Sequence, residues 1–277
     1  MDDKAAAAQS LLPDAMPEQP RGGTAARHAY GMLPVVLPIL TAAMALLAWE
    51  VVVKAAGVNP SILPPPSAIM ERLLVLYPLI LQHAVSTGTE TLVAFGISVP
   101  LGILLAVAMT YSKLVNWAIY PNLIFFQLIP KIALAPLFIV WLGIGAPSRV
   151  SFSVFVCFFP IMIATAAGLQ SVDRDLLRLC RSVLATDMQI MFHVRLPYSL
   201  PYIFSGMKVS VTLAIIGIVV GEFIASQAGL GYLILFASSR QQTDFSLACI
   251  VVLCVIGLAM YGVVELGEVL MRRWYGN

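Results

Sequence analysis

Six long apolar runs, separated by polar segments, constrain this chain more than any other feature of its sequence. A helix that crosses the hydrocarbon core of a bilayer needs about 20 mostly apolar residues. Only 11% of the residues are charged and 60% are hydrophobic, whereas soluble domains have about 25% and 45–50%. The sequence therefore predicts an all-α polytopic membrane protein in which residues 31–277 form one transmembrane domain. We expect spans at about 33–53, 90–111, 118–141, 150–170, 201–224 and 246–270.

Residues 1–30 are rich in alanine, proline and glycine. They contain no continuous apolar core before a cleavage site, so they do not match a secretory signal peptide. We interpret them as a disordered cytoplasmic tail.

The distribution of lysine and arginine predicts the orientation, because cytoplasmic segments are enriched in these residues. With a cytoplasmic N-terminus, six spans also return the C-terminus to the cytoplasm. The outer side then holds four cations, one more lies within a span, and eleven are cytoplasmic: Lys4, Arg21, Arg27, Lys113, Arg174, Arg178, Arg181, Arg195, Lys208, Arg272 and Arg273. The polar connection 171–200 is thus predicted to face the cytoplasm.

Within this connection, Arg174, Arg178 and Arg181 recur at i, i+4 and i+7, opposite a stripe of leucines. This spacing indicates a short amphipathic helix. It is compatible with a helix resting in the lipid headgroups and with a docking element for a cytoplasmic partner.

A second short helix is predicted from Asp187, because Thr186 and Gln189 match a capping box. We expect this helix to stop before Pro197, and Pro201 to begin the fifth span. The two prolines fix how the helix pair leaves the membrane, and this favours the docking interpretation.

The chain also resembles the membrane subunit, or permease, of ABC importers, in the branch that takes up nitrate, sulfonate and taurine. These permeases carry Glu-Ala-Ala, then a glycine four residues later, then Ile-x-Leu-Pro. Leu196 and Pro197 match the closing motif, and Val194 occupies the isoleucine position. Leu184 stands at the glycine and Arg178 at the glutamate, so the opening half departs from the pattern. Further similar stretches are QLIPKIALAPLFIVWLGIG, LPYSLPYIFSGMKVSVTLA and GEFIASQAGLGYLI, and the resemblance covers about 33–273.

The resemblance implies that 171–200 is a coupling loop seated on an ATPase subunit. It implies a permease homodimer in the bacterial inner membrane, two ATPase subunits and an extracytoplasmic solute-binding protein. The expected cargo is a small organic or anionic solute. A thiamine-precursor pyrimidine or similar small aromatic is slightly favoured over nitrate, sulfonate or taurine.

Polar residues inside apolar runs are functional candidates, because a charge at the bilayer centre costs at least about 2.5–3.5 kcal/mol on insertion scales. Gln127, Pro130 and Lys131 of the third run are predicted to line a translocation path. The alternative is that Lys131 pairs structurally with a backbone carbonyl or an acid. Glu222, at the end of the fifth run, is interpreted either as a residue at the water interface or as a gate or partner to Lys131.

Several classes are disfavoured. There is no GxxxxGK[ST] or HExxH, and the histidines and cysteines lack metal-ligand spacing, so we expect no cofactor, no metal and no catalytic activity in this chain. A net charge of +2 gives no indication of nucleic-acid binding. The alternative of a stand-alone secondary transporter requires two related halves, and residues 33–141 do not visibly repeat in 150–270.

Overall fold

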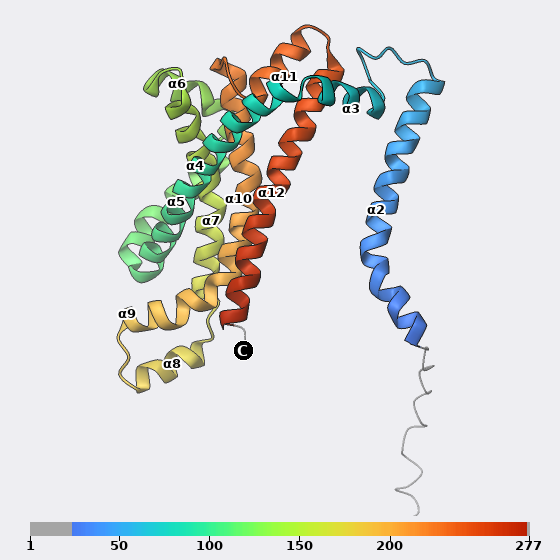
Figure 1. Cartoon of the computed structure of the whole chain (residues 1–277). Coiled ribbons are helices and arrows are strands. Elements are labelled where there is room, and N and C mark those ends of the chain that lie inside the picture. Colours follow the sequence, from blue (N-terminus) through green and yellow to red (C-terminus); the bar gives the residue numbers. More distant parts are fainter. Residues whose placement is uncertain (1–23, 276–277) are drawn as a thin grey trace, which may run out of the picture. The chain divides into compact units, whose positions relative to one another are not determined.

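The computed structural model describes residues 24–275, and every regular element in that range is a helix (Figure 1). The elements in chain order are α2 (Thr24–Ala55), α3 (Pro66–Val75), α4 (Tyr77–Tyr111), α5 (Lys113–Leu128), the 3₁₀ turn η2 (Lys131–Leu134), α6 (Ala135–Leu142), α7 (Ala146–Gln170), α8 (Arg174–Ser182), α9 (Asp187–Ile190), the π turn η3 (Met191–Arg195), α10 (Leu196–Ala225), α11 (Leu230–Ser239) and α12 (Thr243–Tyr275).

Five helices of the described range are long and apolar enough to cross a membrane, and the bent pair α5 and η2–α6 gives a sixth if it is counted as one span. The predicted all-α polytopic class with about six spans is therefore confirmed. The short helix α3 and the extension of α4 back to Tyr77 lie before the predicted second span.

The chain divides into two compact units, residues 1–52 and 53–277. Most of α2 belongs to the first unit, and its side chains from Val36 to Ala48 are exposed, as expected for a span that contacts lipid or other helices. α2 begins at Thr24, inside the segment predicted as a tail, so residues 24–30 are helical. The remainder of that predicted tail, 1–23, lies outside the described residues.

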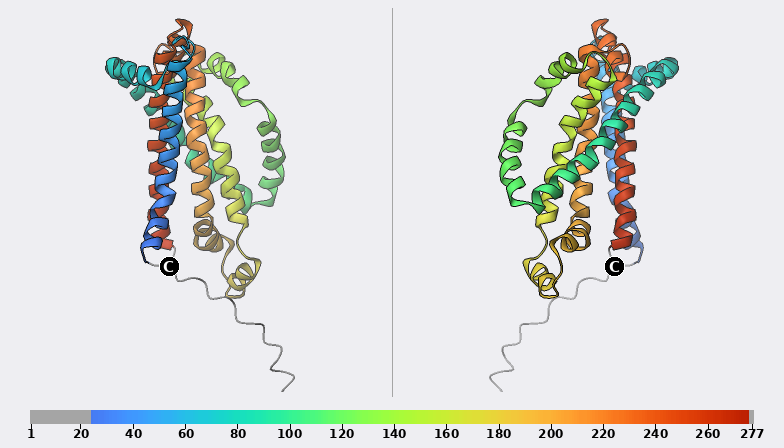
Figure 2. Two further views of the ribbon diagram at one scale, coloured as in Figure 1. Left: turned by 90° about the vertical axis from the view of Figure 1, so that its right-hand side faces the viewer. Right: turned by 90° about the vertical axis from the view of Figure 1, so that its left-hand side faces the viewer.

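In the second unit, α7 packs against both α4 and α10 (Figure 2). Two glycines of α10 allow this approach. A Cβ added at Gly206 would lie 2.7 Å from the Cβ of Ala164, and one added at Gly217 would lie 2.8 Å from the Cα of Ser153. Small residues at helix interfaces let membrane helices pack backbone to backbone.

Hydroxyl groups complete the α7–α10 interface. Ser153 Oγ donates to the carbonyl of Ala214 at 2.8 Å, and Ser210 Oγ donates to the carbonyl of Cys157 at 2.6 Å. All four residues are buried, so these bonds satisfy polar groups where water and lipid do not reach.

A break after Leu128 corrects the predicted continuous span over 118–141. α5 and the following helical segment are bent by 92°. Ile129 is extended, with φ −68° and ψ 131°, because the residue before a proline disfavours the helical conformation. The next proline, Pro136, lies in the first turn of α6, where a missing N–H costs least, so it causes no further break.

The predicted stop before Pro197 is also wrong. α9, η3 and α10 form one helix of 39 residues from Asp187 to Ala225. The wide π turn η3 allows this continuity. The N–H of Leu196 bonds to the carbonyl of Met191, five residues back. This wider turn comes immediately before Pro197, whose ring would clash with the carbonyl four residues back in an ordinary α-helical turn. Pro201 lies inside α10 and does not begin it.

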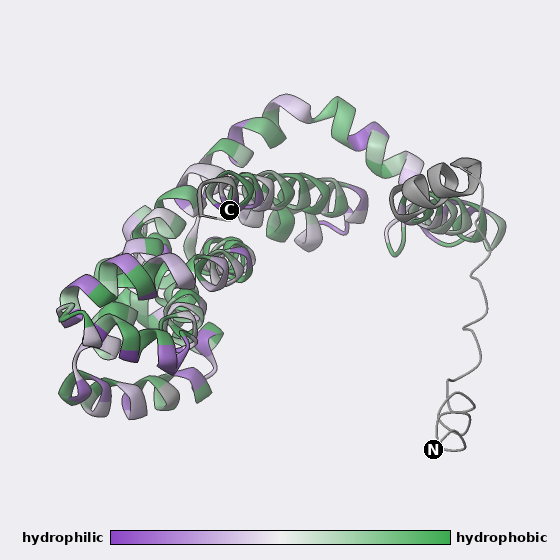
Figure 3. Ribbon diagram, turned by 90° about the horizontal axis from the view of Figure 1, so that it is seen from below, coloured by the Kyte–Doolittle hydropathy of each residue, from purple (hydrophilic) through white to green (hydrophobic). Residues whose placement is uncertain are grey.

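The connection between the predicted spans 201–224 and 246–270 contains the short helix α11. α11 and α6 lie at one end of the second unit, whereas α8, α9 and the last turns of α12 lie at the other (Figures 1 and 2). In a view from the α8–α9 end, hydrophilic and hydrophobic residues alternate on the helices at the left, which include α8 and α9 (Figure 3).

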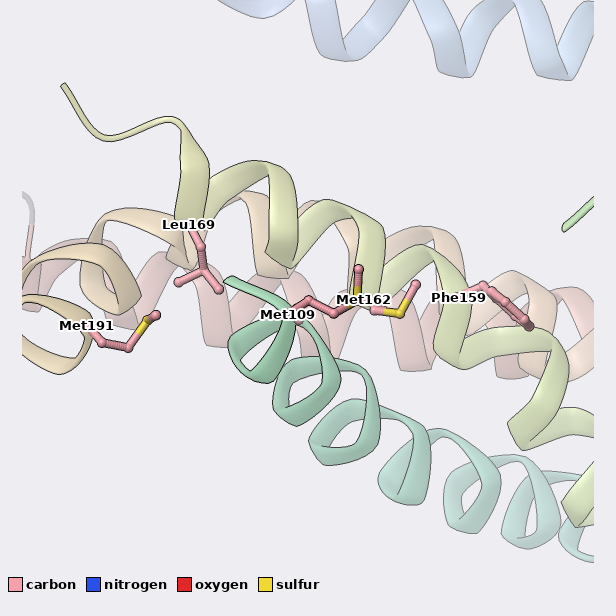
Figure 4. Packing of buried hydrophobic residues seen from close by; sticks show 6 residues of the cluster. Met109, Phe159, Met162, Leu169 and Met191 are labelled. Carbon is pink, nitrogen blue, oxygen red and sulfur yellow. The ribbon is translucent and has the colours of Figure 1, made fainter. Parts of the chain in front are cut away.

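The base of the α8–α9 segment is fixed to the spans by a buried apolar cluster. Met191 of η3 lies at one end of this cluster, which continues through Met109 of α4 and Leu169 and Met162 of α7 to Phe159 at its other end (Figure 4). These side chains are at most 4% exposed. The cluster holds the start of the long helix Asp187–Ala225 against α4 and α7.

Candidate functional site

The connection 171–200 contains two short helices joined by a tight turn. Asp173 caps α8 by accepting a hydrogen bond from the N–H of Asp175 at 2.9 Å. Arg178 donates to Asp175 at 2.8 Å, one turn away on the same helix. Both of these side chains are largely exposed, so the ion pair contributes little to stability and Arg178 stays accessible. Arg174 lies in the first turn of α8 and is exposed.

The turn between the two helices projects apolar side chains outward. Val183 is 72% exposed and Leu184 is 89% exposed. Leu184 has φ +59°, the left-handed region that favours glycine. The position at which the permease pattern has glycine therefore does need a left-handed backbone, and this chain fills it with leucine.

The predicted capping box at the start of α9 is confirmed. Thr186 Oγ1 accepts from the N–H of Gln189, and the Gln189 side chain accepts from the N–H of Thr186 at 2.8 Å. Arg181 approaches Asp187 at 3.9 Å and thereby bridges α8 and α9. Val194, Leu196 and Pro197 follow in the continuous helix and are half-buried.

The three path candidates of the third run lie at the break between α5 and α6. Gln127 and Pro130 are exposed and Lys131 is half-buried. The ammonium of Lys131 lies 4.7 Å from the ring centroid of Phe159 in α7, a cation–π contact. Within the described range no carbonyl or carboxylate bonds to Lys131, so the expected pairing with such a group is not found there.

Gln127 contributes to a groove of about 420 Å³ between α5 and α7. Its polar lining comes from both helices and consists of Asn116, Tyr120, Gln127 and Gln170. Polar side chains along a groove at membrane depth suit a water-lined cavity better than a lipid contact.

Glu222 lies elsewhere and is only 1% exposed. Thr87 of α4 donates to it at 2.7 Å, and the N–H of Gly231 in α11 donates to it at 2.7 Å. Thr87 Oγ1 also accepts from the N–H of Leu230 at 2.8 Å. Glu222 thus ties the N-terminal end of α11 to α4 and α10, and its partners in the structure do not include Lys131.

A second buried polar pair lies nearby and was not predicted from the sequence. Arg149 of α7 is 8% exposed, and it donates to Glu90 of α4 through Nε at 2.8 Å and through Nη2 at 2.5 Å. His83 is a further missed residue, because its Nδ1 accepts from the N–H of Gly229 at 2.9 Å. The sequence did hold one indication of the Arg149–Glu90 pair, because charged residues at the ends of apolar runs need a partner of opposite charge.

Among residues 24–275, no group of three His, Cys, Asp or Glu side chains gathers in a metal-binding arrangement. The fold and the site define a multi-pass α-helical membrane protein with a helical loop at one end and a polar groove beside a broken span.

Comparison with known proteins places this class in a family. Residues 98–273 match the family model of the binding-protein-dependent transport system inner membrane component. The chain is 34% identical to a formylaminopyrimidine transport permease protein of Halalkalibacterium halodurans, over 86% of this chain and 95% of that protein. It is 30% identical to a taurine transport system permease protein of Escherichia coli, over 88% and 91% of the two chains.

A solved structure of the MetNI methionine ABC transporter in inward-facing conformations has a similar fold, with a TM-score of 0.51 and 20% identity over 70% of this chain and 96% of that chain. The chain therefore belongs to the binding-protein-dependent transport system inner membrane component family and is a permease subunit of an ABC importer.

Proposed function

We propose that this chain carries a small organic or anionic solute across the bacterial inner membrane, with ATP hydrolysis performed by a separate ATPase subunit. A soluble binding protein delivers the solute at the α6–α11 end. Two ATPase subunits bind the α8–α9 segment of two permease copies on the cytoplasmic side, the side to which the distribution of lysine and arginine assigns both termini.

One observation carries the proposal: the loop is joined to a span without a hinge. α9 continues through η3 into α10 as one helix, and Met191 packs this helix against α4 and α7. A displacement of the loop is therefore transmitted to α10 as a rigid-body movement, which is what conversion of ATPase closure into opening of a path requires.

The residues expected to contact the ATPase are the exposed cations and the apolar turn of the loop. Arg174, Arg178 and Arg181 lie on α8, and Val183 and Leu184 project from the turn. Apolar side chains in the centre and arginines around them match the usual composition of a protein interface.

The α5–α7 groove supports a path formed by two copies of the chain. The groove is open on one side, and a second copy related by a two-fold axis closes it with an identical groove. Gln127 and Lys131 then lie on the wall of the path. Lys131→Ala or Lys131→Glu is expected to abolish uptake in proteoliposomes while leaving assembly intact. Unchanged transport contradicts the assignment.

Within the small-solute class, a thiamine-precursor pyrimidine or similar small aromatic is the substrate we favour, and taurine, sulfonate or nitrate are the alternatives. The formylaminopyrimidine permease at 34% identity supports the first choice over the taurine permease at 30%. The ligand bound by the binding protein that delivers solute to this permease tests the choice directly.

Co-purification tests the coupling assignment. A tagged full-length chain co-expressed with its proposed ATPase subunit is expected to retain that ATPase on an affinity column. The variant Arg178→Glu/Arg181→Glu is expected to release it, because like charges then face the partner. Arg240→Glu, a single charge reversal at the opposite end of the spans, is expected to retain it, and Arg178→Glu and Arg181→Glu are compared with it one at a time. Uptake without any ATPase, in contrast, indicates a secondary transporter.

A further inference from the structure

A polar cavity lies between the α8–α9 segment and the ends of α4 and α5. Its volume is about 230 Å³, and its polar and charged lining consists of Thr110, Tyr111, Lys113, Arg181, Asp187 and Arg195. This volume is smaller than the roughly 300–1,000 Å³ of pockets for drug-sized ligands. The cavity therefore suits a compact group more than a whole transported solute.

The charge in the cavity is unbalanced. Three cations from three different elements face one carboxylate, Asp187. Asp187 is 3.9 Å from Arg181, and both side chains are largely exposed, so water screens this contact and neutralises little charge. Lys113 and Arg195 have no ion-pair partner among the residues that the structure describes.

Three other cations of the same unit are neutralised by carboxylates. Arg72 pairs with Asp244 at 3.0 Å and Arg149 pairs with Glu90. Lys208 lies between Glu265 and Glu268. Lys113 and Arg195 differ from these three cations because they share one cavity and neither has a carboxylate partner among the described residues.

The position of the cavity indicates where its ligand comes from. It lies where α4 ends at Tyr111 and α5 begins at Lys113, at the end of two membrane helices, which is the depth of the phospholipid headgroups. The N-terminal end of α5 also carries a partial positive charge. Tyr111 is exposed, as aromatic side chains at membrane–water interfaces are.

We propose that the Lys113–Arg181–Arg195 cavity binds a phosphate-bearing anion, supplied by the headgroup of an anionic membrane lipid such as phosphatidylglycerol. Lysine and arginine both bind phosphate, arginine through two parallel hydrogen bonds. A phosphate held there contacts α5, α8 and η3 together. It therefore fastens the α8–α9 segment to the spans that flank it.

The site is tested with the purified full-length chain by native mass spectrometry, with phosphatidylglycerol and phosphatidylcholine as probes. The wild-type chain is expected to retain phosphatidylglycerol in preference to phosphatidylcholine. Lys113→Gln/Arg195→Gln is expected to weaken this retention about tenfold or more, since two charge-assisted contacts are lost. Arg240→Gln, which removes an exposed cation at the other end of the unit, is expected to bind as wild type.

A second set of variants keeps the test decisive if the double variant does not fold. Lys113→Arg/Arg195→Lys preserves the charge and is expected to retain the lipid, whereas each single glutamine variant is expected to lose part of it. Inorganic phosphate is the probe for the second source of the same chemistry. Protection of the chain from thermal unfolding by millimolar phosphate, without a preference for phosphatidylglycerol, assigns the cavity to a soluble phosphate.

Two results overturn the proposal. One is equal retention of phosphatidylglycerol by the wild type and by all the glutamine variants. The other is a wild-type chain that shows neither a preference for phosphatidylglycerol nor protection by phosphate.

Discussion

At the scale of single residues, Leu184 turns the chain between α8 and α9 in a backbone conformation that favours glycine. A left-handed non-glycine residue costs about 1–2 kcal/mol. A side chain that is 89% exposed recovers little of that cost by packing within the chain. We infer that two other features hold Leu184 in this left-handed conformation. One is the capping box at Thr186, which fixes the start of α9, and the other is the sharp change of direction between α8 and α9.

Leu184→Gly is expected to leave the chain as stable as the wild type, or more stable by up to about 1 kcal/mol, because relief of strain outweighs the greater freedom of glycine in the unfolded state. Leu179→Gly is the matched control inside α8 and is expected to cost about 1 kcal/mol. Thermal unfolding of the two purified variants in detergent compares them. If Leu184→Gly lowers the unfolding temperature as much as Leu179→Gly does, the left-handed backbone at Leu184 is not a source of strain.

Glu222 illustrates a different residue-scale effect, the satisfaction of buried donors. Glu222→Ala leaves the N–H of Gly231 without its acceptor, which is expected to cost about 1–3 kcal/mol, whereas the hydroxyl of Thr87 keeps a second acceptor in the carbonyl of His83 at 3.3 Å. A lower unfolding temperature measures the loss. Glu71→Ala, at an exposed position of α3, removes a carboxylate without burying a donor and is expected to change nothing. A stable Glu222→Ala chain that fails in transport supports the gate interpretation instead.

At the scale of elements, hydrophobic run length predicted the existence of helices well and their ends less well. α7, α10 and α12 follow the predicted runs within a few residues. α11 was missed because ten residues are too few to register as a span. The 92° bend after Leu128 was missed because the residues on both sides of Pro130 are equally apolar, and run length carries no information on direction.

The continuous helix α9–η3–α10 is the element on which the proposed coupling depends. His193→Gly/Val194→Gly is expected to cost about 2 kcal/mol of helix stability in this connector, which shifts its helix–coil equilibrium about thirtyfold. We expect ATP hydrolysis by the assembled complex to persist while uptake falls, because loop movement no longer reaches α10. Both rates are measured in the same proteoliposomes.

Met70→Gly/Glu71→Gly is the matched control for this experiment. Both residues are exposed in the middle of α3, so the change removes a similar helix propensity away from the loop. Equal uptake by the two double variants indicates that the rigid connection is not what transmits the movement.

At the scale of the whole molecule, the candidate site was predicted in part. The loop residues, the capping box and the left-handed turn position could be recognised because they depend on neighbours within a few positions of the chain. The contacts of Glu222 could not, since Thr87 is 135 residues away. The pairing of Arg149 with Glu90 spans 59 residues, and spacing in a single sequence does not show which charges meet.

The largest-scale proposal is that two copies of the chain enclose one path between their α5–α7 grooves. A cysteine at position 127 of each copy then lies near the two-fold axis and near its symmetry mate. In a chain whose four native cysteines are replaced by serine, Gln127→Cys is expected to form a covalent dimer in membranes treated with a bifunctional thiol reagent. Leu258→Cys is the control, because Leu258 is also exposed (72%) but lies on α12, which does not line the groove. A chain with this cysteine is expected to remain monomeric under the same treatment. Cross-linking at 258 and not at 127 places the two-fold axis at α12 and removes Gln127 and Lys131 from the path.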